Sequence, residues 1–160
     1  MTAHIRRAVP ADAAAITTMI HDLARFEHAA DQCTVVETQI STALFDQPAT
    51  LRAHVAEVDG EIAAMALWFL NFSTWDGLEG IYLEDLYVQP RFRRLRLARG
   101  LLTALAQECM DNGYTRLSWA VLNWNIDAIA LYRAVGGQPQ GEWTTYRLSG
   151  PELAALAGPG

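Results

Sequence analysis

The sequence LEDLYVQPRFRRLRLARGLL, residues Leu83 to Leu102, contains the most informative pattern of the chain. It starts with an apolar run that carries two adjacent carboxylates, Glu84 and Asp85. Pro90 ends this run, because proline has no N–H group to donate to a sheet ladder. Five arginines follow within residues 91–99, and they lead into apolar residues at helical spacing. The pattern predicts a strand that runs through a basic turn into a helix.

A turn between a strand and a helix presents unpaired N–H groups and the positive end of the helix dipole at one place, which favours an anion. Arginine adds bidentate bonds to phosphate oxygens. The chain has twelve arginines, no lysine and a net charge of −6, so the basic residues are concentrated in an otherwise acidic protein. Two interpretations stay open: a solvated helix start, or a site for a phosphorylated ligand. Glu84 and Asp85 favour the second, because they place proton-accepting groups beside the turn, and adjacent strand residues face opposite sides.

Periodicity and turn signals predict the other elements on both sides of this stretch. Asp59-Gly60 between two apolar runs is a strong hairpin signal, and Gly113 marks a helix end. The expected elements are a strand at 4–8, helices at 11–26 and 36–44, hairpin strands at 51–58 and 61–71, a strand at 80–88, a helix at 97–112, a strand at 115–122, a helix at 125–135 and a strand at 143–148. This order predicts an α/β (α+β) fold around one largely antiparallel sheet with a parallel pairing in its middle.

Length and composition set further expectations. A chain of 160 residues predicts one domain, here placed at residues 1–157, with a frayed tail at 158–160. No long apolar run or signal-peptide pattern is present, which predicts a cytoplasmic protein without a membrane partner. Two cysteines and four scattered histidines predict no metal site. The negative net charge argues against nucleic acid as a partner.

Three motifs resemble one known family. YLEDLYV, residues 82–88, is similar to a strand of the diamine (spermidine/spermine) N-acetyltransferase branch of the GNAT superfamily. Residues 93–98 occupy the place of the family's acetyl-CoA loop, Q/R-x-x-G-x-G/A. WNIDAIALYRAVG, residues 124–136, matches the branch's WN-x-x-x-I-x-x-Y-x-x-x-G helix, and DLARFEHAADQ, residues 22–32, extends the likeness. The resemblance implies a single-domain GNAT fold, a mostly antiparallel mixed sheet flanked by helices with a V-shaped cofactor cleft.

The resemblance also implies an activity and a cofactor. It implies an acetyl-CoA-dependent N-acetyltransferase acting on the primary amine of a small molecule such as a diamine, a polyamine or a lysine-like amino acid. A bulge near Leu86 to Val88 would direct a backbone N–H at the thioester oxygen. Asn125 either bonds the pantetheine arm or caps its helix. The implied cofactor-binding residues are Leu86, Tyr87, Val88, Arg93, Arg94, Leu95, Arg96, Leu97, Ala98, Arg99, Asn125 and Ala128.

The chain departs from the family pattern at Arg94 and Arg96, which stand where the branch commonly has glycine. If these positions need a left-handed backbone, each residue with a Cβ costs about 1–2 kcal/mol, and the side chain obstructs the approach of pyrophosphate. If they belong instead to the first turn of the helix, the cost shrinks and the arginines add phosphate contacts. A non-catalytic acyl-CoA-binding protein is therefore one alternative, and an antibiotic (aminoglycoside-type) acetyltransferase is another.

Acetyl transfer to an amine requires that a proton leave, because an alkylamine with a pKa of about 10.4 is protonated at neutral pH. We expect Glu84 to accept this proton, as the resemblance also implies. Tyr132 resembles the family's general acid, although a tyrosine on an amphipathic helix is often a core residue. Carboxylates beside the acceptor would balance its ammonium charge, and a tryptophan face would attract a cation. The expected acceptor-binding residues are Phe26, Glu27, Trp75 and Asp85. The branch resemblance also implies a homodimer.

Overall fold

The structure is a computed structural model that describes residues 2–158. Two compact units divide the chain, the first up to Ile126 and the second from Asp127. The elements are β1 (Ala3–Arg7), α1 (Ala13–Phe26), α2 (Glu37–Phe45), β2 (Arg52–Val58), β3 (Glu61–Ser73), β4 (Leu78–Val88), α3 (Leu97–Asn112), β5 (Leu117–Trp119), α4 (Ile126–Ala134) and α5 (Gly150–Ala157). Short 3-10 turns precede α1, α2 and α3.

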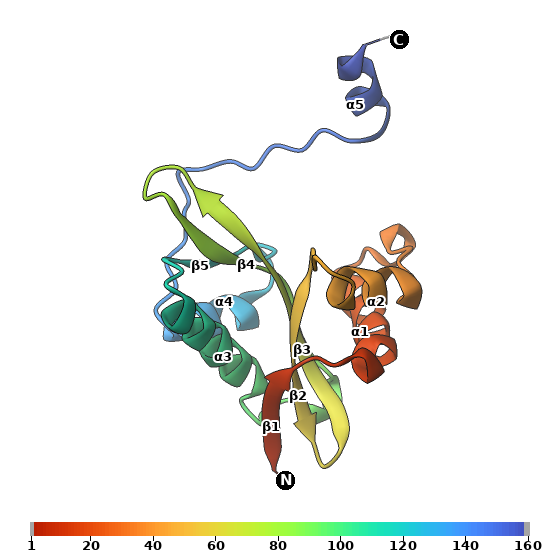
Figure 1. Ribbon diagram of the computed structural model, residues 1–160, viewed down its shortest axis with the longest axis vertical. Coiled ribbons are helices and arrows are strands. Elements are labelled where there is room, and N and C mark those ends of the chain that lie inside the picture. The colour runs from red at the N-terminus through yellow and green to blue at the C-terminus, as the bar shows by residue number, and fades with distance from the viewer. Residues whose placement is uncertain (1, 159–160) are drawn as a thin grey trace. The chain divides into compact units, whose positions relative to one another are not determined.

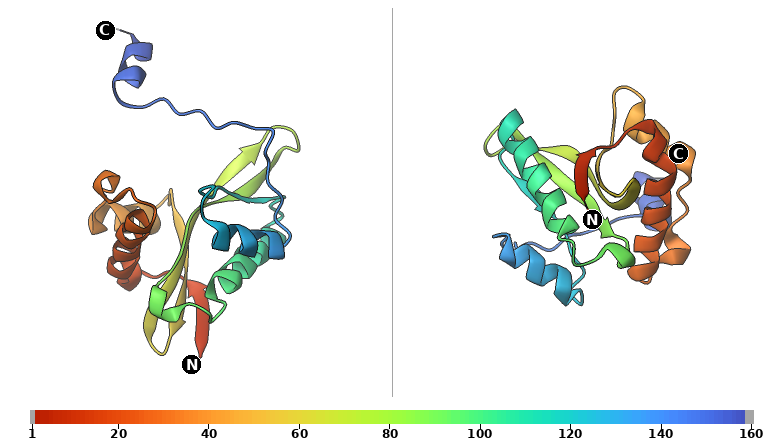
Figure 2. Two further views of the ribbon diagram at one scale, coloured as in Figure 1. Left: turned by 180° about the vertical axis from the view of Figure 1, so that it is seen from behind. Right: turned by 90° about the horizontal axis from the view of Figure 1, so that it is seen from below.

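The first unit is built on a five-stranded sheet in the order β1-β2-β3-β4-β5. The first four strands are antiparallel neighbours, and β5 lies parallel to β4. Figures 1 and 2 show α1 and α2 on one face of this sheet and α3 on the other. The predicted fold class, an α/β fold around a mixed and mostly antiparallel sheet, is confirmed. No helix within residues 2–158 is long and apolar enough to cross a membrane.

The two faces of the sheet bury separate sets of side chains, as alternation along the strands requires. On the face covered by α1 and α2, Ile16 and Met19 pack with Met65 and Leu67 in one buried cluster. Trp68, next in the strand, is fully buried on the other face, where its indole N–H donates to His54 Nδ1 at 3.1 Å. Apolar side chains of β3 are therefore buried on both faces of the sheet, and they fix the register of this strand.

The sequence predictions fail mainly near the carboxyl end. Residues 143–148, predicted as a strand, are not a strand, because strands need a pairing neighbour and no strand of the described residues pairs with them. The parallel pairing consequently lies at the edge of the sheet and not in its middle. The sequence also missed α5, although Ser149 stands at its N-cap and Pro151 in its first turn. Residues 159 and 160 of the expected tail lie outside the described residues, and the domain limits 1–157 stay a prediction.

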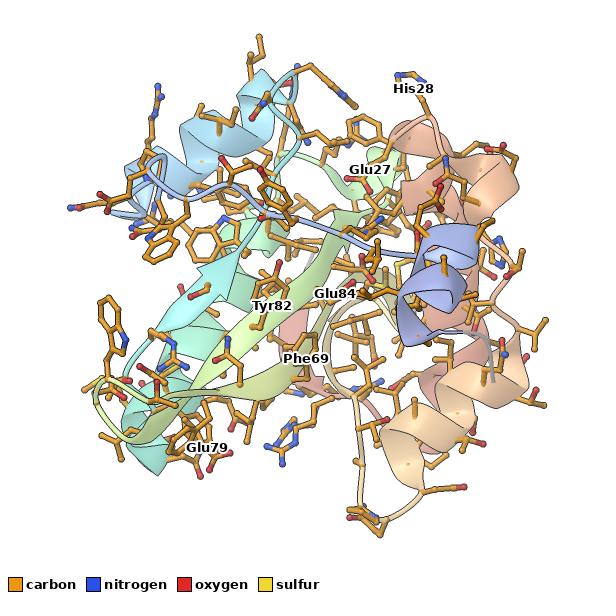
Figure 3. The ribbon with its side chains drawn as sticks, turned by 90° about the horizontal axis from the view of Figure 1, so that it is seen from above. Glu27, His28, Phe69, Glu79, Tyr82 and Glu84 are labelled. Atoms are coloured by element: carbon orange, nitrogen blue, oxygen red, sulfur yellow. The ribbon has the colours of Figure 1, made fainter. Side chains whose placement is uncertain are left out.

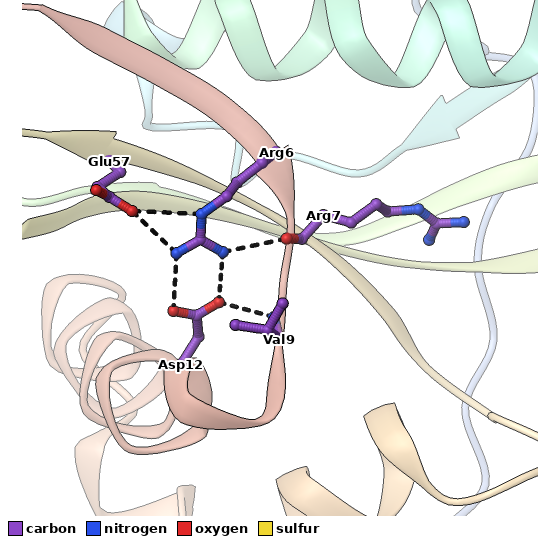
Figure 4. Close-up of polar contacts among 5 residues, drawn as sticks. All are labelled: Arg6, Arg7, Val9, Asp12 and Glu57. Carbon is purple, nitrogen blue, oxygen red and sulfur yellow. Dashed lines mark hydrogen bonds and ion pairs between the residues drawn. The ribbon is translucent and has the colours of Figure 1, made fainter. Parts of the chain in front are cut away.

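One ion-pair network joins the amino-terminal strand to the first helix (Figure 4). Arg6 donates to both carboxylate oxygens of Asp12, at 2.7 and 3.1 Å, and to Glu57 on β2. Asp12 is buried and also accepts the N–H of Val9 at 2.8 Å. Burial alone would raise the pKa of Asp12, but the Arg6 and Val9 hydrogen bonds outweigh it and lower the pKa below its ordinary value. The network ties β1, β2 and the start of α1 together.

Replacing Asp12 with alanine is expected to lower the free energy of unfolding by about 1.5–3 kcal/mol, because Arg6 would lose its charged hydrogen bonds to this buried carboxylate. The matched control is Asp22→Ala, which removes an exposed pair with Arg25 and should cost less than about 1 kcal/mol. Since the pKa of Asp12 is lowered, its contribution is present at neutral pH and is lost as the pH falls through that pKa. Urea titrations of both variants at pH 7 test this. Equal losses in the two variants would contradict it.

Candidate active site

A β-bulge lies in β4 at Glu84. Leu67 of β3 pairs with Asp85, and its neighbour Trp68 pairs with Leu83, so Glu84 has no partner of its own. The expected position, near Leu86 to Val88, is therefore wrong. The apolar pairs on both sides fix the register, and the one extra residue of β4 falls between them, a position that the sequence of β4 alone does not reveal.

The bulge decides which backbone N–H groups of β4 face away from β3. The N–H of Gln89 donates to Ala63 O at 2.9 Å, so this N–H group faces β3. Because N–H groups along a strand alternate between its two edges, the N–H of Tyr87 also faces β3, whereas the N–H groups of Leu86 and Val88 face the opposite edge. The extra residue thus changes which residues present their N–H groups at that edge.

The opposite edge of β4 has a partner over only part of its length. Near its start, the N–H of Ile81 donates to Arg116 O at 2.9 Å, and pairing with β5 ends at Leu83 opposite Trp119. Among residues 2–158, no strand pairs with this edge from Glu84 to Val88. The N–H groups of Leu86 and Val88 therefore face a stretch of edge without a pairing strand, and their contact with a cofactor stays a prediction.

Tyr87 is predicted to bind the cofactor, and the structure places its side chain in the core. Its side chain is buried with Met65 and Leu67 in the core under α1, and burial raises the pKa of its phenol. Its N–H faces β3. Neither its side chain nor its N–H group is available at the open edge, because alternation along the strand assigns Tyr87 to the core.

Three predicted carboxylates gather at the bulge. Burial, together with the nearby charges of Glu84 and Glu27, raises the pKa of Asp85 to about 6. Burial also raises the pKa of Glu27, which follows the last residue of α1. Figure 3 shows Glu84 on β4 and Glu27 at the end of α1. Two of these carboxylates, Glu27 and Asp85, are partly desolvated, and Glu84 is exposed beside them, an arrangement that favours a cation.

Both arginines at the expected glycine positions adopt left-handed backbone conformations. Arg94 has φ of 70°. Arg96 has φ of 58° and ψ of 27°, and α3 begins only at Leu97. The interpretation in which they belong to the first helical turn is therefore wrong. Each costs about 1–2 kcal/mol relative to a relaxed backbone. The turn keeps the conformation that glycine would adopt easily.

The basic turn offers a set of hydrogen-bond donors that fits phosphate. The Arg96 carbonyl accepts the N–H of Gly100 at 3.0 Å, which starts the helix, and no side chain caps it. Within residues 2–158, no acceptor bonds the N–H groups of residues 94–99. Such orphan donors at a helix start are suited to phosphate oxygens. The predicted Leu95, Leu97, Ala98 and Arg99 contribute to this set.

Aromatic side chains surround the end of α1. The ring of Phe26 lies 5.6 Å from that of Trp124, and His28 lies 5.5 Å from Trp124. The guanidinium carbon of Arg93 lies 5.9 Å from the Phe26 ring centroid. The sequence prediction missed Trp124 and His28 as neighbours of Phe26, although both stand in segments that resemble the family. The backbone N–H of Asn125 bonds Leu122 O at 2.9 Å.

The structure separates Trp75 from the carboxylates. Trp75 is 90 % exposed in the turn between β3 and β4. From Leu78 to Glu84 the strand covers about 20 Å at roughly 3.3 Å per residue, so Trp75 lies far from the bulge along β4, and its expected role in acceptor binding stays a prediction. Ala128 and Tyr132 lie on α4 in the second unit, and their expected roles stay predictions.

Among residues 2–158, no group of three or more His, Cys, Asp or Glu side chains has the arrangement of a metal site. The chemistry that the described site can supply comes from carboxylates, backbone N–H groups and guanidinium groups. This combination is suited to holding an ammonium group beside a phosphorylated ligand.

Comparison with known proteins identifies the family of this chain. The model of the acetyltransferase (GNAT) family matches residues 17–136. A thialysine N-epsilon-acetyltransferase of Caenorhabditis elegans is 38% identical over 152 residues, covering 92% of each chain. Its Bos taurus counterpart is 33% identical and covers 96% of each chain. An integron cassette protein of V. cholerae shares the fold, with a TM-score of 0.82, 21% identity and 99% of each chain covered.

The chain belongs to the GNAT family and is an N-acetyltransferase. GNAT acetyltransferases use acetyl-CoA. The family match covers β4, the basic turn and α3, and continues through α4. The residues gathered at the bulge therefore lie within the part of the chain that defines the family.

Asp85→Asn is expected to stabilise the protein at pH 7 by about 1–3 kcal/mol, because it removes a charge that the folded state disfavours. A carboxyl whose pKa rises from 3.8 to about 6 on folding destabilises the protein at pH values above that range. The advantage of the variant should therefore shrink as the pH falls from 6 towards 4. Urea titrations at pH 7 and pH 4.5 measure this, with Asp31→Asn, an exposed carboxylate, as the control. A destabilised Asp85→Asn variant at pH 7 would refute the expectation.

Proposed function

We propose that this N-acetyltransferase moves an acetyl group from acetyl-CoA to the terminal amine of a lysine-like amino acid. The observation that carries the proposal is the cluster of Glu27, Glu84 and Asp85 on and beside a strand edge with open N–H groups. Two relatives that match nearly the whole chain are named thialysine N-epsilon-acetyltransferases, which supports an acceptor of this size and charge.

The open edge and the basic turn fit the two ends of the cofactor. The N–H groups of Leu86 and Val88, which face an edge without a pairing strand, would bond the amide groups of the pantetheine arm and the thioester oxygen. The N–H groups of residues 94–99 are placed to bond phosphate oxygens. Bound there, acetyl-CoA supplies an activated acyl group on a thiol leaving group. Asn125 and Ala128 remain predicted contacts of the same cofactor.

The carboxylates hold the acceptor and take its proton. Asp85 and Glu27 balance the charge of the ammonium group, which would otherwise be costly to desolvate. Glu84 accepts one proton from the acceptor nitrogen, directly or through water, so that the free amine attacks the acetyl carbon. General-base help of this kind is typically worth about 10²–10⁴-fold. The new C–N bond would replace the C–S bond, and the second proton of the nitrogen would leave to solvent. Tyr132 would give its proton to the departing sulfur and regain one from solvent.

Glu84→Gln is expected to lower kcat by at least about tenfold at pH 7.5 while CoA affinity stays within about twofold, because the change removes only the proton acceptor. The matched control is Glu79→Gln, an exposed glutamate further from the bulge on the same strand, which should retain full turnover (Figure 3). Thiol release from acetyl-CoA measures kcat, and calorimetry measures CoA binding. Full turnover in Glu84→Gln would remove Glu84 from the mechanism.

The same assay with a panel of acceptors tests the proposed substrate class. Thialysine, lysine and ornithine should give higher kcat/KM than spermidine or an aminoglycoside. A panel in which spermidine is the best acceptor would move the proposal to polyamines, and thiol release with none of these amines would refute it. Asp85→Asn should raise KM for the acceptor more than it changes CoA affinity, since Asp85 is assigned to the ammonium group.

Tyr132→Phe is expected to lower kcat by about tenfold with little change in KM for the amine, because the hydroxyl serves the leaving sulfur only. Tyr146→Phe is the control, since Tyr146 is 92% exposed in the same unit and should keep the full rate. Steady-state kinetics of both variants make the comparison. An unaltered kcat in Tyr132→Phe would show that the Tyr132 hydroxyl is not the general acid and that the residue serves packing.

A further inference from the structure

We propose that a ring N–H of His28 binds the α-carboxylate of the amino-acid acceptor, so that this residue selects amino acids over diamines that lack a carboxylate. The inference rests on the proposed function, because it concerns the far end of the same acceptor. It gives a role to a side chain that the chemistry of acetyl transfer leaves unused.

The charges of the acceptor set the requirement. A lysine-like acceptor carries a carboxylate at the end opposite its reacting amine. The amine is balanced by Glu27, Glu84 and Asp85, but the same three groups would repel the carboxylate. A carboxylate is also costly to desolvate unless a donor faces it. The acceptor therefore needs a hydrogen-bond donor close to the three carboxylates and on the side away from the reacting position.

His28 lies where such a donor is needed. It follows Glu27 directly, at the end of α1. Figure 3 shows Glu27 between Glu84 and His28, so His28 is placed beyond Glu27 as seen from the bulge. Its ring lies 5.5 Å from that of Trp124, which also lies 5.6 Å from the ring of Phe26, and all of these residues belong to the first unit. An acceptor whose amine reaches Glu84 would extend past Glu27 towards the His28 ring.

The backbone at the end of α1 would suit glycine at residue 28 better than histidine. The N–H of Ala29 donates to Ala24 O at 2.8 Å and the N–H of His28 to Arg25 O at 3.2 Å, the two bonds of a Schellman helix end. The residue at this position of the motif has positive φ and is usually glycine, whereas His28 has φ of 60°. The chain thus keeps a side chain where glycine would relieve the backbone, and such local strain is common at functional sites.

The imidazole of His28 is available to a ligand. The ring of His54 is used by the fold, since its Nδ1 accepts the indole N–H of Trp68 at 3.1 Å. Within the described range 2–158, no hydrogen bond or ion pair engages the ring of His28, and the residue is exposed. A neutral imidazole carries one N–H donor, and contact with the Trp124 ring restricts how it turns.

Lysine and lysinamide are the sharpest pair of acceptors, because they differ only in that an amide replaces the carboxylate. Thiol release from acetyl-CoA gives kcat/KM for both. The unaltered protein should prefer lysine by about tenfold or more, the effect of one hydrogen bond to a charged group. His28→Ala should lower this preference about tenfold, mainly through a higher KM for lysine, while calorimetry shows CoA affinity within about twofold. The same preference in both proteins would overturn the inference.

Three further variants separate the donor from packing and from the backbone. His28→Phe keeps a ring against Trp124 but has no donor, so the preference for lysine should be lost. His28→Asn keeps a donor and tolerates positive φ, so part of the preference should remain. His28→Gly should lose the preference and yet raise the Tm of the free protein, because it relieves the left-handed backbone. His4→Ala, which changes an exposed histidine on β1, is the control and should keep the full preference.

A preference for lysine that survives in His28→Phe would show that the ring only packs, and it would overturn the inference. Equal kcat/KM for lysine and lysinamide in the unaltered protein would also overturn it, but would leave acetyl transfer to a lysine-like amine intact. Thiol release with neither acceptor would overturn the proposed function as well.

Discussion

The site depends on one extra residue in β4. Glu84 has no partner on β3, so the alternation of N–H groups between the two edges of β4 shifts by one residue at that point. The N–H groups of Leu86 and Val88 therefore face the edge of β4 that lies beyond the end of its pairing with β5. The same bulge places Glu84 beside Asp85. A single register shift therefore brings the proposed proton acceptor and the proposed donors for the thioester to one strand edge.

The site is held at some cost to stability. Asp85 is a carboxylate whose pKa is raised to about 6 by burial and by neighbouring carboxylates. Arg94 and Arg96 occupy left-handed conformations. These features persist because the rest of the unit is fixed independently, by the apolar pairs along β3 and by the Arg6 network. Local features that lower stability and gather in one place are common at functional sites.

The sequence predicted most elements of the first unit, because their signals are local. The limits of α3 match the prediction, and Gly113 ends the helix with φ of 72° as expected. Of the predicted carboxylates, Glu27 and Glu84 both raise the pKa of Asp85. The position of the bulge and the burial of Tyr87 depended on the register with β3, which the sequence of β4 does not contain. The strand expected at 143–148 failed for a related reason, since apolar alternation favours a strand but only a pairing neighbour forms one. The homodimer and the absence of a nucleic-acid partner stay predictions from the sequence.

Hydrogen–deuterium exchange at single amides of β4 tests the central claim most directly. The account predicts fast exchange at Leu86 and Val88 in the free protein and slow exchange at Tyr87, which faces β3. Addition of CoA should then slow exchange at Leu86 and Val88. Equal protection of all three amides in the free protein, or no response of Leu86 and Val88 to saturating CoA, would contradict it.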